Sequence, residues 1–124
     1  MIILDSCVLI AFADPTDIFH PDACRVLTTT EALAITALTA AETMVHTSPQ
    51  QHNLWRRTFD DLGTEVIPIT GSDIEKIAET RSTSGLKMPD ALVLWLAESR
   101  DAAVASFDQR LINTAQERNL RTIQ

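Results

Sequence analysis

Short apolar runs alternate with helical patterns along this chain, and that alternation limits the fold more than any other feature. Strand-like runs cover residues 2–4, 34–35, 65–69 and 103–105. Between them, apolar residues recur at intervals of three and four, which is typical of helices with one buried face. Strands separated by helices predict parallel pairing, with helices on both faces of the sheet. The sequence therefore predicts a three-layer α/β/α fold around a short parallel sheet.

The expected helices fill the segments between these strands. They cover residues 7–13, a segment after Pro21, a segment from Leu38 to Val45, residues 51–62, a segment through Ile74 and Ala78, residues 90–99 and residues 107–118. A capping box at Ser72 and Glu75 is expected to open the fifth helix, and residues 82–85 form a polar break after it. Residues 90–99 are apolar nearly all round, which predicts a central helix. Residues 119–123 are compatible with one more short strand.

Size and composition indicate one globular domain over residues 1–124. No apolar run is long enough for a membrane span, and no basic leader precedes the first apolar run, so neither a membrane segment nor a signal peptide is expected. Two cysteines are too few for a disulfide framework, and a reducing cytoplasm is the default location. Cys7 is expected to be a small buried hydrophobe.

Four acids, Asp5, Glu42, Asp90 and Asp108, sit where apolar segments start or stop. If the strands are parallel, all four lie near the edge formed by the carboxyl ends of the strands, where open α/β sheets build their sites. Glu42 is expected on the buried stripe of its helix, together with Leu38, Ala41 and Val45. Asp90 and Asp108 each precede apolar residues at offsets of three, four and seven, so all three acids are expected to face the core.

Inward carboxylates at one edge repel each other unless protons or a cation neutralise them. Hard oxygen ligands of this kind suit Mg²⁺ or Mn²⁺, so the set predicts a metal site. A structural alternative exists for each acid. Thr39 and Glu42 have the spacing of a capping box, as do Ser106 and Gln109, and Asp90 lies where an acid stabilises the helix dipole. One shared metal site is favoured over four independent caps.

The four acids also occur in motifs whose order and spacing resemble PIN-domain ribonucleases of the VapC toxin type. The motifs are LDSCVLI at residues 4–10, LTAAE at 38–42, LKMPDAL at 86–92 and SFDQRL at 106–111. Each motif alone is unspecific, but the ordered set spans nearly the whole chain. The resemblance implies a PIN-like fold and cleavage of RNA phosphodiester bonds with Mg²⁺, for which Mn²⁺ can substitute. It also implies a metal-activated water as the nucleophile and products with a 5′-phosphate and a 3′-hydroxyl.

On this resemblance, Asp5, Asp90 and Asp108 are the principal metal ligands, directly or through water, and Glu42 completes the catalytic pocket. Ser6 and Ser106 are expected to orient a carboxylate or a metal-bound water. For both serines the structural alternative is N-capping, which is slightly favoured for Ser106.

The resemblance further implies a homodimer neutralised by a VapB-like antitoxin whose tail wraps the toxin and places a basic residue at the acidic pocket. The formal net charge of −7 fits such a partner better than free RNA. Bound metal or spatial grouping of the ten basic residues would offset that charge. The apolar residues not needed for the core are candidates for the antitoxin groove or the dimer contact: Ile18, Phe19, Leu54 and Trp55.

RNA contacts are expected from four basic residues: Arg56, Arg57, Lys87 and Arg110. Trp55, beside the adjacent arginines, is compatible with base stacking but more typical of a core or dimer position. His46, one turn after Glu42, is compatible with the pocket but is not assigned to it.

Other functional classes fit less well. A phosphoacceptor receiver domain needs a lysine after its last strand, and only Lys76 and Lys87 are present, neither of them there. A haloacid-dehalogenase-type phosphatase needs Asp-x-Asp after the first strand, where this chain has Asp5-Ser6-Cys7. Two alternatives stay open: a PIN fold that only binds RNA or a protein, and a housekeeping PIN nuclease rather than a toxin.

Overall fold

The computed structural model describes residues 1–124 and contains a five-stranded sheet in the order β3-β2-β1-β4-β5. The strands are β1 Ile2–Leu4, β2 Leu33–Thr36, β3 Thr64–Ile67, β4 Ala103–Ala105 and β5 Thr122–Ile123. Every neighbouring pair is parallel. The predicted parallel sheet is confirmed, including the fifth strand at the end of the chain.

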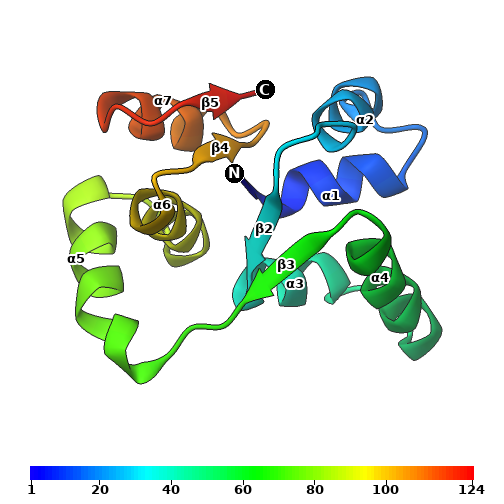
Figure 1. Ribbon diagram of the computed structural model, residues 1–124, viewed down its shortest axis with the longest axis horizontal. Helices are drawn as coiled ribbons and strands as arrows, with labels where there is room; N and C mark the ends of the chain where they lie inside the picture. Colours follow the sequence, from blue (N-terminus) through cyan, green and yellow to red (C-terminus); the bar gives the residue numbers. More distant parts are fainter.

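Helices cover both faces of this sheet. They are α1 Ser6–Ala13, α2 His20–Leu27, α3 Ala37–Met44, α4 Pro49–Asp61, α5 Ile74–Ser84, α6 Met88–Arg100 and α7 Gln109–Glu117, with a 3₁₀ turn, η1, at Gly71–Asp73. Figure 1 shows α5, α6 and α7 on one side of the sheet and α1 to α4 on the other. The three-layer α/β/α prediction is therefore confirmed. None of these helices combines the length and apolarity that crossing a bilayer requires.

Alternate strand residues point to opposite faces and divide the core in two. Ile3, Ala34 and Val104 pack with α6 and α7 on one face. Ile2, Leu4 and their neighbours pack with α1, α2 and α4 on the other. Helix α6 is buried along Ala91–Ala97, which confirms its predicted central position. Strand β3 pairs only with β2 and ends just before Pro68, so that proline marks both the sheet edge and the end of the strand.

Two local predictions about the fifth helix are wrong. The capping box is formed by Thr70 and Asp73 around η1, not by Ser72 and Glu75. The polar segment after Arg81 continues α5 to Ser84, because its hydroxyl groups bond to carbonyl oxygens within the helix. The helix ends at Gly85, whose φ of +70° is left-handed and free of strain only for glycine.

Candidate active site

One open pocket collects all four acids that the sequence singles out. It is lined by Asp5, Ser6, Cys7, Ile10, Asp17, Phe19, Glu42, Asp90, Phe107 and Asp108 and has a volume of about 420 Å³. Asp5 directly follows β1, and Asp108 follows its neighbour β4, so the carboxyl ends of adjacent parallel strands deliver them to one place. Glu42 comes from α3 and Asp90 from the first turn of α6.

Asp5 is the most firmly held of these carboxylates. Its side chain is only 7% exposed and caps α1 by accepting a 2.8 Å hydrogen bond from the Ser6 backbone N–H at Oδ1. Its Oδ2 accepts a 2.7 Å hydrogen bond from the Ser106 hydroxyl. A carboxylate has about four acceptor positions. The two strong bonds therefore fix its orientation and leave capacity for a further ligand.

Ser106 links two of the acids instead of capping a helix. Its fully buried hydroxyl donates to Asp5 and accepts a 2.9 Å hydrogen bond from the Asp108 backbone N–H. The N-cap of α7 is Asp108, whose Oδ1 accepts from the Arg110 backbone N–H at 2.9 Å. The slight preference for Ser106 as an N-cap is therefore wrong, and α7 begins at Gln109, two residues later than expected.

Asp108 does not face the core as predicted, because it is exposed at the pocket rim. The apolar residues that follow it are buried, but an N-cap residue has extended backbone and lies off the helical face that they define. Asp90 is half-buried ahead of the buried face of α6, as expected.

Glu42 reaches the pocket from a different face of its helix than predicted. The buried residues of α3 are Thr39, Ala40 and Thr43, whereas Val45 is 62% exposed. Glu42 lies half-buried at the border of that face. The N-cap of α3 is Thr36, so Thr39 and Glu42 form no capping box. Small threonines form the buried face here, and the apolar spacing pointed to the wrong side.

The electrostatics of Glu42 and Asp90 fit a site for a proton or a cation. Burial, followed by the charges of Asp5 and Asp108, raises the pKa of Asp90 to about 6, while Lys87 and Arg110 lower it in part. Burial, followed by the charges of Asp5 and Asp90, also raises the pKa of Glu42. Neither side chain forms a hydrogen bond or ion pair with the protein. Protonation or a bound cation would compensate the charge that remains on these two carboxylates.

Cys7 is a member of the site that sequence reasoning missed. Its thiol lies 3.3 Å from Asp5 Oδ2, and its sulfur accepts the Phe107 backbone N–H at 3.4 Å. Burial, followed by the charge of Asp5, raises the pKa of Cys7 to about 12, so the thiol of this pocket is protonated at neutral pH. Asp17 and the rings of Phe19 and Phe107 were also not assigned to the site. Only the position of Phe107 between Ser106 and Asp108 pointed to it.

The carboxylates match the hard oxygen ligands that Mg²⁺ prefers. As the side chains stand, however, no three acidic, histidine or cysteine groups are close enough together to enclose one ion. Mg²⁺ keeps several waters and is often held by one or two carboxylates together with substrate phosphates. The carboxylate oxygens of this pocket fit that mode of binding. They do not enclose an ion with protein ligands alone.

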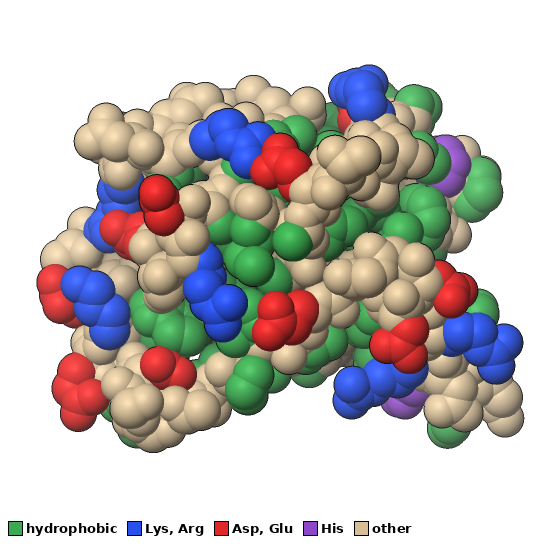
Figure 2. Space-filling view, viewed as in Figure 1, with side chains coloured by type: hydrophobic (Ala, Val, Ile, Leu, Met, Phe, Trp, Pro, Cys, Tyr) green, Lys and Arg blue, Asp and Glu red, His purple; other side chains and the backbone are tan.

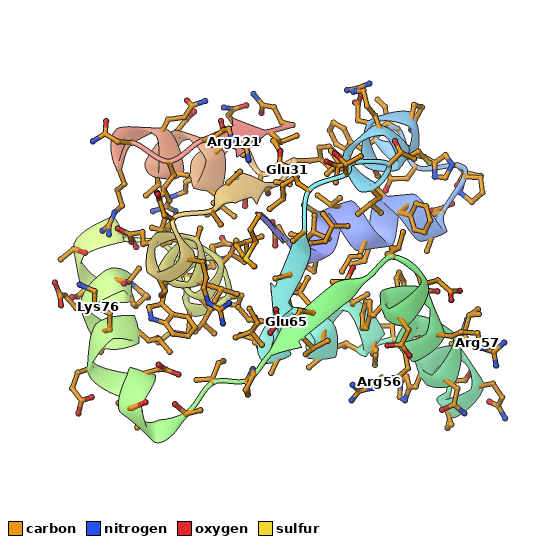
Figure 3. The ribbon with its side chains drawn as sticks, viewed as in Figure 1. Glu31, Arg56, Arg57, Glu65, Lys76 and Arg121 are labelled. Carbon is orange, nitrogen blue, oxygen red and sulfur yellow. The ribbon has the colours of Figure 1, made fainter.

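The four predicted RNA contacts divide into two pairs. The positive charges of Lys87 and Arg110 lower the pKa of Asp90 in part. Arg110 Nη2 also donates a 3.0 Å hydrogen bond to the Gly85 carbonyl. Arg56 and Arg57 lie on α4 and do not line the pocket, and Figure 3 shows Arg57 pointing outward from the molecule. On the face shown in Figure 2, basic side chains alternate with acidic ones and form no continuous basic patch.

A second hollow adjoins the acidic pocket between α1 and α4. Glu42, Ile10, His46 and Trp55 line its nearer part, and Phe12, Leu54 and Trp55 line its farther part. Trp55 is half-buried and packs on Phe59 with ring centroids 5.8 Å apart, while Leu54 is 59% exposed. His46 therefore borders this hollow and not the acidic pocket.

Comparison with known proteins agrees with this geometry. The PIN domain family model matches residues 2–117. No curated protein sequence matches significantly. The fold is similar to that of VapC20 of Mycobacterium tuberculosis, a sarcin–ricin loop cleaving toxin, with a TM-score of 0.76, 14% identity and coverage of 91% of this chain and 94% of that one.

Two toxin–antitoxin structures are also similar. A complex from Klebsiella pneumoniae has a TM-score of 0.69 and 23% identity and covers 88% of each chain. VapBC2 of Rickettsia felis, bound to a promoter DNA fragment, has a TM-score of 0.69, 17% identity and coverage of 98% of this chain and 97% of that one. At these identities the likeness concerns the fold alone. The family match over nearly the full length shows that this chain belongs to the PIN domain family of nucleases.

Proposed function

We propose that this protein is a metal-dependent endoribonuclease and the toxin of a toxin–antitoxin pair. The observation that carries the proposal is the convergence of four carboxylates, from four separate segments of a PIN domain, on one open pocket. Two of them have raised pKa values and no partner in the protein. Unpaired, partly buried carboxylates lower the stability of a fold, and carboxylates with shifted pKa values are typical of functional sites.

In this proposal Asp5, Asp90 and Asp108 bind Mg²⁺, directly or through water, and Glu42 completes the pocket. Ser106 and the Ser6 backbone N–H hold the Asp5 carboxylate in one orientation. This ligand is therefore in position before an ion binds. Mn²⁺ is expected to substitute, because it accepts the same oxygen ligands.

The bound cation would supply an activated water and charge stabilisation for in-line attack on the phosphodiester. The residues of the chain perform the remaining tasks. Glu42, which lines the pocket without being assigned as a principal metal ligand, is placed to accept a proton from a water in the pocket. Lys87 and Arg110, beside Asp90, are placed to hold the RNA backbone, with Arg56 and Arg57 as more distant contacts. The products would carry a 5′-phosphate and a 3′-hydroxyl.

The partner in this proposal is a VapB-like antitoxin, and the toxin itself is a cytoplasmic homodimer. The solved toxin–antitoxin complexes of the same fold support the antitoxin as the partner. The apolar hollow formed by Phe12, Leu54 and Trp55 continues from the acidic pocket, which suits a partner segment with apolar and basic side chains.

The deciding experiment is cleavage of a defined RNA panel by the purified protein, free of any antitoxin, in Mg²⁺, Mn²⁺ or EDTA. Wild type is compared with Asp5→Asn and Asp90→Asn, which keep side-chain size but remove charge. Asp60→Asn is the matched control, because Asp60 is an exposed acid on α4 outside every pocket. We expect metal-dependent cutting in wild type and control, and a loss of at least about a hundredfold in both pocket variants.

Cleavage in EDTA, or full activity in both pocket variants, would contradict the proposal. A folded wild type that cuts no RNA in either metal but binds RNA or a protein would instead support a PIN fold with a binding role only. Cutting without growth inhibition on expression would favour a housekeeping nuclease over a toxin.

A further inference from the structure

Two phenylalanine rings form one wall of the acidic pocket. Phe19 precedes α2 and Phe107 follows β4, and their rings stack with centroids 4.6 Å apart and planes only 9° from parallel. Both rings line the pocket beside Asp5 and Asp90. Phe19 is 41% exposed. A large exposed ring in the wall of a polar pocket adds little to the core, so its position calls for another explanation.

Backbone hydrogen bonds hold both rings in place. The Phe19 N–H donates to Asp17 Oδ1 at 2.8 Å, and the Phe19 carbonyl accepts the Ala23 N–H at 2.8 Å. The Phe107 N–H donates to the Cys7 sulfur at 3.4 Å. Asp17 and Cys7, which also line the pocket, therefore fix the backbone segments that carry the rings. A wall that is ordered before binding loses little entropy when a ligand packs on it.

We propose that this stacked pair, Phe19 and Phe107, is a platform for one nucleobase of the RNA substrate, next to the cleaved bond. The inference rests on the proposed nuclease function and deepens it. Phe107 covers one face of Phe19, and Phe19 nevertheless stays 41% exposed and lines the pocket. A base that packs there continues a parallel stack of aromatic rings, an arrangement that gives substantial affinity to single-stranded nucleic acid.

The position of the platform favours a base over an apolar protein side chain. A phosphate held near the four acids through a cation places its own nucleotide within the same pocket, so the flat ring of that nucleotide lies close to the aromatic wall. Every base offers such a face, and stacking alone discriminates weakly among them. The platform therefore positions the strand while contributing little to sequence preference.

The test compares cleavage by wild type, Phe19→Ala, Phe19→Trp and Ile74→Ala. Ile74 is the control, because it is also a large apolar side chain, is 61% exposed and lines no pocket. We expect Phe19→Ala to lower kcat/KM at least about fivefold, mainly through KM, because stacking acts on the bound substrate. Phe19→Trp restores activity, Ile74→Ala leaves it unchanged, and thermal unfolding confirms that all four proteins are folded.

Substrates with a single abasic nucleotide at successive positions around the cut separate stacking from a structural role. Wild type should lose activity at one abasic position adjacent to the cut, and Phe19→Ala should lose nothing further there. Additive losses at that position would overturn the proposal, because the ring would then act through the loop and not through the base. Equal activity of Phe19→Ala and Ile74→Ala would overturn it as well, including the case in which Phe19→Ala weakens only antitoxin binding. If wild type cuts no RNA, the proposed function has failed, and not the platform alone.

Discussion

A single hydroxyl group, that of Ser106, connects the carboxylate of Asp5 with the backbone of Asp108. It donates to Asp5 and accepts from the Asp108 N–H, and it is fully buried. In Ser106→Ala, both partners lose their hydrogen bond to this buried hydroxyl. We expect a loss of about 1–2 kcal/mol in the free energy of unfolding and of about tenfold to a hundredfold in the rate of RNA cleavage.

Urea unfolding and single-turnover cleavage measure these two effects. Ser99→Ala is the control, because Ser99 also bonds through its hydroxyl but lies on the exposed end of α6. Cleavage by Ser106→Ala at the wild-type rate would mean that Asp5 keeps its orientation without the serine.

The raised pKa of Asp90 makes the stability of the protein depend on pH. The pKa is about 6 in the folded protein, above the value of about 3.9 for an unfolded chain. The folded state therefore binds more protons between these values. The stability that protonated Asp90 contributes is present below pH of about 4 and is lost as the pH rises through about 6.

In Asp90→Asn this loss is absent. We expect the variant to be more stable than wild type at pH 7.5 in EDTA, by about 1 kcal/mol after allowing for solvent screening of a half-buried group. The difference should shrink as the pH falls to about 4. Urea unfolding across this pH range measures it, and a constant difference at every pH would refute the electrostatic explanation.

At the scale of elements, the end of α5 depends on the backbone of Gly85. Its φ is +70°, and a Cβ at this position would meet no atom within 4 Å. Gly85→Ala should therefore lower the free energy of unfolding by about 1 kcal/mol, through the strain of an alanine at positive φ alone. Gly71→Ala is the matched control, since Gly71 is equally open but has no positive φ, and it should be neutral or slightly stabilising. Equal effects in the two variants would argue against strain at Gly85.

The number, type and order of the strands and helices could be predicted from the sequence, because the spacing of apolar residues indicates which residues are buried. The orientation of single helices was less predictable. In α3 the buried face consists of small residues, Thr39, Ala40 and Thr43, which an apolar periodicity does not detect. In α5 a run of polar residues suggested that the helix ends. Their hydroxyl groups instead donate hydrogen bonds to carbonyl oxygens of the same helix, which continues through them.

At the scale of the whole molecule, the formal net charge is −7, and the four pocket acids contribute to it. A divalent cation bound there should stabilise the entire fold, because only the folded state brings these carboxylates together. At a concentration about a hundred times its Kd, Mn²⁺ should add about 2.7 kcal/mol to the free energy of unfolding. NaCl at the same ionic strength should add less. Thermal unfolding measures the response, which Asp60→Asn should keep and Asp5→Asn should lose. An equal response of Asp5→Asn would place the cation elsewhere.

The convergence of the four acids could be predicted, because parallel strands end at one edge. The hydrogen bonds that connect them could not. The contact of Ser106 with Asp5 joins residues 101 positions apart, and it depends on β1 and β4 being neighbours in the sheet. Asp17 and the stacking of Phe19 on Phe107 were missed for the same reason, since no local spacing indicates which loops meet.

The place of β1 in the middle of the sheet has a consequence for the synthesis of the protein. Asp5 is synthesised before its neighbour strand β4, and the hydroxyl of Ser106 follows 101 residues after Asp5. At about 5–20 residues per second, translation takes roughly 5 to 20 seconds to cover that interval. During this time the first strand lacks one of its two partners and the pocket does not exist. The site proposed to cleave RNA therefore cannot form on the growing chain until that interval has been translated.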